Sequence, residues 1–141
     1  MPNRADVIAE ARTWLGVPWK HQGRTRRGVD CAGVVVCVAV ALGLSAYDTK
    51  AYQRRTHSNE FLRHFREAMD EKPVSEAQPG DVMLFRDSAY PCHSAIIGER
   101  DGELTIIHGH AMHRKVLEER LSQGDWMQKR VACFQFRGLE G

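Results

Sequence analysis

Thirteen consecutive residues, Cys31 to Gly43, carry no charge and are almost all apolar or small. This stretch is longer than a typical strand, Asp30 before it is a favourable N-cap residue, and Gly43 can end a helix, so the pattern predicts a helix. Because the stretch is apolar on every side, we expect this helix to be buried in the middle of the domain. It is too short to span a bilayer.

Two further stretches carry apolar residues at helical spacing. Asn3–Leu15 predicts an N-terminal helix, in which Asn3 and Asp6 can form a capping box. A second amphipathic helix is expected at about Asn59–Met69. Residues 45–57, between this helix and the central one, are polar and are expected to be irregular.

The second half of the chain alternates short apolar runs with turn residues, which predicts strands. Asp101-Gly102 separates two such runs and indicates a hairpin. The expected strands are Val82–Phe85, Cys92–Gly98, Leu104–His108, Arg114–Glu118 and Lys129–Arg137. Helices followed by about five strands with short connections indicate an α+β fold with an antiparallel sheet, in a single domain spanning residues 1–141.

Composition narrows the class of protein without identifying it. The chain has 141 residues, 27% of them charged, and a net charge of +2, which is too small to argue for nucleic-acid binding. The N-terminus has no signal-peptide pattern and no transmembrane helix is expected, so we expect synthesis and folding in a reducing cytosol. The four cysteines lack paired spacing, which argues against a zinc finger or a disulfide scaffold.

Cys31 is the residue whose predicted position favours chemistry. It lies in the first turn of the central helix, where unpaired backbone N–H groups and the helix dipole favour negative charge. We therefore expect a lowered thiol pKa and a nucleophilic thiolate. The alternative is that Cys31 is only a small buried hydrophobic residue.

The predicted hairpin brings two histidines together. His93 begins one strand and His108 ends the next, so antiparallel pairing places both at the same end of the hairpin. If the central helix packs its N-terminus against that end, Cys31 acquires a base in His93. His108 can then fix the tautomer of His93 by a hydrogen bond.

Two other features of the sequence have open interpretations. Cys92, beside His93, is the other candidate nucleophile, but adjacent strand residues point to opposite faces, which argues against it. The loop before the central helix carries Arg24, Arg26 and Arg27, which are either simply solvated or attract a carboxylate-rich substrate.

Five short motifs follow one another along nearly the whole chain: Gly16-Val17-Pro18-Trp19, Asp30-Cys31-Ala32-Gly33, Pro79-Gly80-Asp81, His93-Ser94-Ala95-Ile96 and Ile107-His108-Gly109. In this order they resemble the NlpC/P60 family of cysteine peptidases. The resemblance implies a compact papain-like fold with N-terminal helices packed on the sheet. It also implies hydrolysis of peptidoglycan stem peptides at γ-D-glutamyl and diaminopimelate bonds, without a cofactor or metal.

The resemblance also implies a role for each matching residue. Cys31 is the nucleophile, His93 the general base and acid, and His108 the third catalytic residue. The backbone N–H of Cys31 faces the oxyanion, a contribution of about 3 kcal/mol in comparable sites. We expect four further side chains to lie on the substrate side of the cleft: Trp19, His21, Asp30 and His110.

Two positions depart from the family pattern. Trp19 replaces a tyrosine, so any hydrogen bond from that hydroxyl is lost or altered. Ala32 replaces a serine that helps to bind the substrate's free amine in cell-wall recycling members, so the resemblance does not extend to recycling-type specificity. Asp30 is retained, and it either binds that amine or only caps the helix.

The closest resemblance is to members found in phage tails and phage-derived gene transfer particles. Those members carry a basic strand after the third catalytic residue, here His113 to Glu118. This implies an enzyme of the tail of a virion or phage-like particle, made without a signal peptide and acting on the cell wall or periplasm. Its partners would be peptidoglycan stem peptides and tail-tip proteins, with no nucleic acid and no membrane span.

Two alternatives to an active peptidase remain open. The first is a zinc site formed by His108, His110 and His113 with Cys92 or His93, although it gives Cys31 no purpose. The second is a catalytically inactive structural or wall-binding tail component with the same fold.

Overall fold

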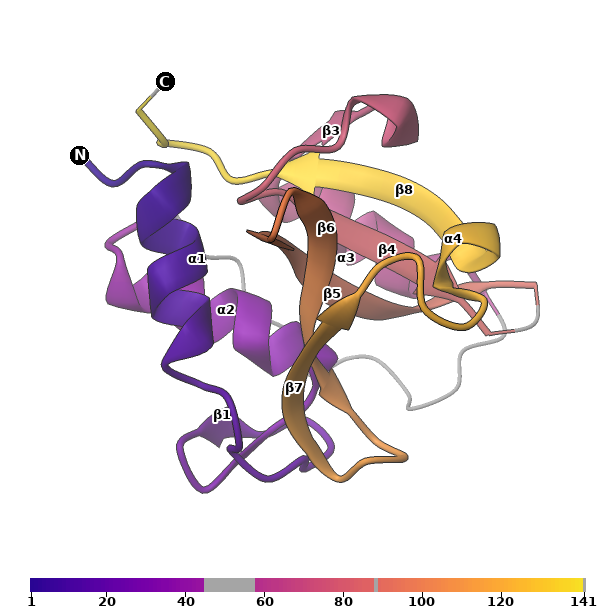
Figure 1. Ribbon diagram of the computed structural model, residues 1–141, viewed down its shortest axis with the longest axis horizontal. Coiled ribbons are helices and arrows are strands. Elements are labelled where there is room, and N and C mark those ends of the chain that lie inside the picture. Colours follow the sequence, from indigo (N-terminus) through magenta and orange to yellow (C-terminus); the bar gives the residue numbers. More distant parts are fainter. Residues whose placement is uncertain (45–57, 88, 141) are drawn as a thin grey trace.

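The structure, a computed structural model, describes residues 1–44, 58–87 and 89–140. Its centre is a six-stranded antiparallel sheet in the order β3-β8-β4-β5-β6-β7 (Figure 1). The strands are β3 (Asp70–Lys72), β4 (Val82–Arg86), β5 (Pro91–Arg100), β6 (Glu103–His110), β7 (Lys115–Arg120) and β8 (Arg130–Gln135). The helices are α1 (Arg4–Arg12), α2 (Cys31–Ala41), α3 (Glu60–Ala68), the 3-10 turn η1 (Val74–Glu76) and α4 (Trp126–Lys129).

The predicted α+β fold is confirmed, with more strands than the sequence indicated. The extra edge strand β3 consists of three charged residues, so it has no apolar alternation that could have predicted it. A separate hairpin of β1 (Arg24–Thr25) and β2 (Gly28–Val29) lies in the loop before α2. The irregular segment predicted at 45–57 lies outside the described residues.

The helices α1, α2 and α3 cover one face of the sheet (Figure 1). The predicted capping box of α1 is present: Asn3 Oδ1 accepts from the Asp6 N–H, and Asp6 Oδ2 accepts from the Asn3 N–H. Apolar residues of the three helices pack on Ile96 and Phe134 of the sheet. Complete burial of the central helix was a wrong expectation, because its C-terminal part reaches the surface and Val40 is 63% exposed.

A smaller core covers the opposite face. It contains Met83, Ile97, Ile106 and Leu121, with Trp126 of α4 packed against it. The hairpin β5–β6 runs between the two cores, and its turn is Asp101-Gly102, as predicted. Both turn residues have positive φ, 54° and 79°, which is typical of a tight two-residue hairpin loop.

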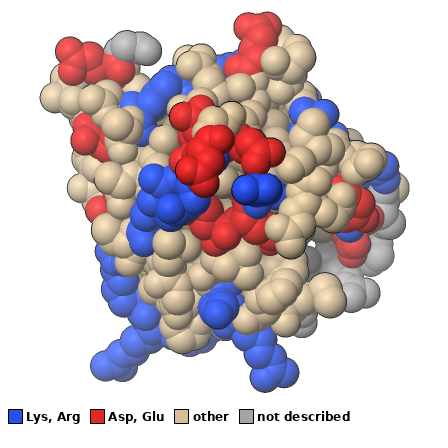
Figure 2. Space-filling model, in the orientation of Figure 1, with Lys and Arg blue, Asp and Glu red and all other residues tan. Residues whose placement is uncertain are grey.

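On the face seen in Figure 2, acidic side chains gather near the centre with basic side chains beside them, and basic side chains project at the lower edge. Charged side chains also link separate elements, because Glu118 of β7 accepts hydrogen bonds from Arg12 of α1 and Arg100 of β5. The two ends of the chain meet in a backbone hydrogen bond from the Glu140 N–H to the Pro2 carbonyl. Of the helices described, none has the length and hydrophobicity needed to cross a membrane.

Candidate active site

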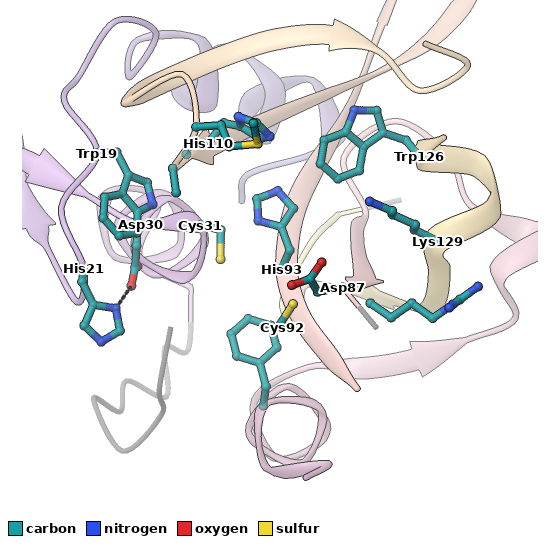
Figure 3. Close-up of a pocket in the computed structure, with 15 residues that line it drawn as sticks. Trp19, His21, Asp30, Cys31, Asp87, Cys92, His93, His110, Trp126 and Lys129 are labelled. Atoms are coloured by element: carbon teal, nitrogen blue, oxygen red, sulfur yellow. Dashed lines mark ion pairs between the residues drawn. The ribbon is translucent and has the colours of Figure 1, made fainter. Parts of the chain in front are cut away.

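A pocket of about 250 Å³ opens where the N-terminus of α2 meets the first residues of β5. In Figure 3, Trp19, His21, Asp30 and Cys31 lie on one side of this pocket, and His93, Cys92 and Trp126 lie on the other. We call the first side the helix wall and the second the sheet wall. All four residues expected on the substrate side, Trp19, His21, Asp30 and His110, line the pocket.

Cys31 is the first residue of α2, as the sequence predicted. Asp30 caps the helix, because its Oδ1 accepts from the Gly33 N–H at 2.8 Å. The preceding loop lies so close that a Cβ at Gly33 would collide with the carbonyl oxygen of Gly23. On the sheet side, a Cβ at Gly109 of β6 would come within 3.0 Å of the Asp30 backbone. Two glycines therefore let the helix start fit between loop and sheet.

The carboxylate of Asp30 has further partners. Its Oδ2 accepts from the Gln22 backbone N–H at 2.8 Å, and its Oδ1 lies 3.1 Å from Nη1 of Arg24. Of the two roles left open for Asp30, these hydrogen bonds support the helix cap. The arginine cluster does not gather at the pocket either, because Arg24 pairs with Asp30 and the guanidinium of Arg26 stacks over Trp14 at 3.7 Å.

The two histidines of the hairpin are in direct contact, as expected. Nε2 of His93 lies 2.7 Å from Nδ1 of His108. His108 is completely buried, so it lies behind His93 and away from the pocket. The ring of His93 is also enclosed by Phe85, with ring centroids 6.0 Å apart, and by Trp126, which stacks on it at 5.4 Å with an interplanar angle of 27°.

The thiol pKa is the opposite of what the helix start led us to expect. Burial raises the pKa of Cys31 to about 12, and the negative charge of Asp30 adds to this effect. The thiol is therefore protonated at neutral pH in the resting protein. A thiolate has to be generated by transfer of the proton to a base.

His93 has the protonation state that such a base requires. Its pKa is held well below 6.5, first by burial and then by the positive charge that His108, His110 and Lys129 can carry. At neutral pH the imidazole is neutral and can accept a proton. The pocket thus holds a protonated thiol and a neutral imidazole at rest.

Ser94, which follows His93 on β5, acts on the sulfur from the core side. Its backbone N–H and its hydroxyl both lower the pKa of Cys31 and so oppose the burial. The hydroxyl is buried and, within the part of the chain that the structure describes, has no partner in good hydrogen-bond geometry at rest. It lies where it can donate to a thiolate.

Several pocket residues were not expected from the sequence. Cys92 lines the pocket although the alternation of strand side chains argued against it. The reason is a β-bulge: Phe85 pairs with His93 and Arg86 with Pro91, so Cys92 is the extra residue, and a bulge re-aims its side chain. Trp126 and Lys129 were missed because nothing in the sequence places α4 beside β5, and Arg86 was missed because it follows the predicted strand Val82–Phe85.

The histidines do not form a metal centre among the residues that the structure describes, where no three potential ligands converge. His108 is occupied on both sides, since its Nδ1 faces His93 and its Nε2 lies 2.9 Å from Oε2 of Glu119. His113 is exposed and contacts His110 through their Nδ1 atoms at 2.8 Å. His110 and His113 therefore lie at the edge of the pocket as a pair.

Comparison with known families supports the arrangement of helix start and strands. The sequence model of the NlpC/P60 family matches residues 16–135, from the loop before α2 to the end of β8. The chain belongs to the NlpC/P60 family. The match includes both walls of the pocket. No curated protein sequence matched this chain.

Solved structures share the NlpC/P60 fold at low sequence identity. An NLP/P60 family protein similar to a lipoprotein, from Staphylococcus aureus, has a TM-score of 0.68 and 20% identity, covering 98% of this chain and 42% of its own. An NlpC/P60 family protein from Bacillus cereus has a TM-score of 0.73 and 19% identity, covering 96% and 41%. The NlpC/P60 domain of the peptidoglycan hydrolase SagA has a TM-score of 0.66 and 21% identity, covering 94% and 98%. The chain thus spans about two fifths of the first two proteins and matches the SagA domain over nearly all of its length.

Proposed function

We propose that this NlpC/P60 domain is a cysteine endopeptidase that hydrolyses amide bonds in peptidoglycan stem peptides, of the γ-D-glutamyl or diaminopimelate type. The observation that carries the proposal is the pocket itself, in which a thiol at a helix N-terminus and a neutral imidazole line the same cavity. SagA, whose domain has the same fold, is a peptidoglycan hydrolase.

In the first half of the proposed reaction, Nδ1 of His93 takes the proton of the Cys31 thiol, since Nε2 of His93 is engaged with His108. The sulfur attacks the amide carbon, and the oxyanion forms near the backbone N–H groups at the start of α2. His93 then gives the proton to the leaving amine. The carbon–nitrogen bond breaks and a thioester remains on Cys31.

In the second half, a water molecule loses a proton to His93 and attacks the thioester carbon. The carbon–sulfur bond breaks, the peptide leaves with a new carboxyl group, and the sulfur recovers its proton from His93. The net reaction consumes one water and requires no metal or cofactor.

The charges around the pocket support an anionic, internal peptide substrate. Arg86 and Lys129 line the sheet wall together with Asp87, and Lys129 also pairs with Asp125 at 3.4 Å. Stem peptides carry free carboxylates that these cations can bind. Asp30 is already paired with Arg24, which does not favour capture of a free substrate amine.

The proposal extends to a place of action. By resemblance, this would be a component of a phage or phage-like tail, made in the cytoplasm and acting on the cell wall, with tail-tip proteins as partners. The resemblance of the basic segment His113 to Glu118 to that branch supports it. Mass spectrometry of purified particles tests this part: the protein should be recovered with the tail proteins, and its absence from particles would contradict it.

One observation favours a second candidate function, an inactive tail component that binds the wall. The pKa of Cys31, raised to about 12 by burial, leaves little thiolate at neutral pH. Such a protein would bind peptidoglycan without releasing fragments.

The test is mass spectrometry of muropeptides after digestion of purified cell walls. The wild-type protein should release new stem-peptide fragments, Cys31→Ala and His93→Ala should release none, and His108→Ala should release fewer. Circular dichroism should show the same fold for all four proteins. Equal digestion by the wild type and Cys31→Ala would rule out the proposal, and binding without digestion by the wild type would favour the inactive component.

A further inference from the structure

Glu119 of β7 ends a continuous chain of side chains that begins at the pocket. His93 Nε2 lies 2.7 Å from His108 Nδ1, and His108 Nε2 lies 2.9 Å from Glu119 Oε2. We infer that Glu119 is a positioning residue that fixes the tautomers of His108 and, through it, of His93. A catalytic role for Glu119 rests on the proposed function, whereas the effect of Glu119 on the two imidazoles does not.

The direction of the hydrogen bonds follows from the carboxylate. The hydrogen bond from His108 lowers the pKa of Glu119, so Glu119 is ionised at neutral pH and can only accept. Nε2 of His108 must then carry the proton and donate it to Oε2. In a neutral imidazole this leaves a lone pair on Nδ1 of His108.

The same argument determines the tautomer of His93. Since Nδ1 of His108 is an acceptor, Nε2 of His93 must be the donor across the 2.7 Å contact. The lone pair of His93 is then on Nδ1, the nitrogen left to take the thiol proton. With the opposite tautomers, Nδ1 of His93 would carry a hydrogen and could not act as a base.

Trp126 holds the far end of this chain in place. Its side chain donates a hydrogen bond to Glu119, which also lowers the pKa of that carboxyl. The same indole stacks on His93 at 5.4 Å and touches His108 edge-on at 5.2 Å. One residue of α4 therefore packs against both imidazoles and binds the carboxylate that orients them.

The neighbouring residue Glu118 provides a matched control on the same strand. Adjacent strand residues point to opposite faces, and Glu118 is bound by Arg12, Arg100 and Thr105 on the helical face of the sheet. Its removal should affect stability through that network, whereas it makes no contact with either imidazole among the interactions described.

The test is NMR of the imidazole nitrogens at neutral pH, with signals assigned by comparison with His93→Gln and His108→Gln. In the wild type, both histidines should be protonated on Nε2 and not on Nδ1. In Glu119→Ala, His108 should populate both tautomers, and His93 should then also populate both instead of the Nε2–H form alone. Glu119→Gln offers an acceptor oxygen and should restore the wild-type tautomers, and Glu118→Gln should leave both signals unchanged.

The kcat for hydrolysis of cell walls is a second measurement, and it would not change if the role of Glu119 were purely structural. Glu119→Ala should lower kcat on the order of tenfold or more, part of what general acid–base catalysis contributes, with little change in KM. Where Glu119→Ala does not fold, Trp126→Phe takes its place as the disrupting variant, because it removes the hydrogen bond to Glu119 and keeps an aromatic ring against His93. It should loosen the tautomers, whereas Glu119→Gln should keep them.

The outcomes separate this inference from the proposed function. Wild-type tautomers in Glu119→Ala, or Nδ1–H on His93 in the wild type, would overturn the inference. The expected tautomers in a protein that digests no cell wall would uphold it and count against the peptidase function.

Discussion

The two walls of the pocket are built from different parts of the chain. The helix wall comes from one continuous segment, residues 16–33, in which Asp30 caps α2 and holds the loop. The sheet wall contains His93 and Trp126, and His108 and Glu119 hold these side chains from behind, so four elements contribute. The helix wall fixes where the sulfur lies, and the sheet wall fixes which nitrogen carries a proton. Variants can separate these two contributions.

The largest expected effect is on the sheet wall. His93→Gln removes the base, so hydrolysis of cell walls should fall by at least about 10²- to 10⁴-fold, the usual contribution of general acid–base catalysis. Muropeptide release measures it. His64→Gln, on α3 and not among the pocket residues, is the control and should keep full activity. Comparable activity in both variants would remove His93 from the mechanism.

On the helix wall, the largest loss of stability is expected where the loop backbone lies closest to α2, at Gly33. Gly33→Ala forces a Cβ against the carbonyl of Gly23, and such overpacking typically costs about 1–3 kcal/mol. Urea unfolding should show a lower free energy of unfolding together with lost activity. Val36→Ala, one turn further along α2, should retain activity, and full stability of Gly33→Ala would show that the loop does not need this close approach.

Replacing Asp30 can separate its two effects, the capping of α2 and the raised pKa of the Cys31 thiol. Asn also caps helices well, so Asp30→Asn keeps the cap while it removes a charge that raises the pKa of Cys31. The pH at which iodoacetamide alkylates Cys31 should therefore move downward, as followed by peptide mapping. Asp87→Asn, in the same pocket, serves as the control, and an upward shift for Asp30→Asn would contradict the assignment.

The lowered pKa of His93 also predicts how stability depends on pH. The unfolded chain binds a proton at this residue near pH 6.5 and the folded protein does not, so folding loses stability as the pH falls below about 6.5. Above that pH the contribution of His93 should be constant. Urea unfolding between pH 5 and 7.5 measures the slope (roughly the range in which histidine titrates), and His93→Gln should flatten it. An unchanged slope would place the proton uptake elsewhere.

The smallest expected effect concerns Ser94. Because its hydroxyl lowers the pKa of Cys31, Ser94→Ala should move the alkylation of Cys31 to higher pH, in the direction opposite to Asp30→Asn. Ser122→Ala, at an exposed serine, should have no effect. A downward shift for Ser94→Ala would mean that the hydroxyl does not face the sulfur as a donor.

The same contrast explains how much the sequence could predict. The helix wall is local: an N-cap residue, an uncharged run and Gly43 at its end were enough to place Cys31 at the start of α2. The contact between His93 and His108 was also predictable, because a hairpin turn fixes which strand ends meet.

What the sequence did not predict depends on distant contacts. Glu119 lay just beyond the expected strand Arg114–Glu118, and its place beside His108 follows from the register in which His108 pairs with Leu117. Cys92 was turned toward the pocket by a bulge that no local pattern indicated. The thiol pKa was misjudged because the depth of burial of Cys31, which outweighs a favourable helix start, comes from packing of the whole sheet on α2.

The most direct measurement of the central claim is the capture of the thioester on Cys31. The protein is mixed with cell-wall stem peptides, quenched in acid, digested and analysed by mass spectrometry. The account predicts a peptide fragment attached to Cys31 in the wild type and none in Cys31→Ala. Release of stem-peptide fragments with no adduct on Cys31, or an adduct on Cys92 instead, would contradict it.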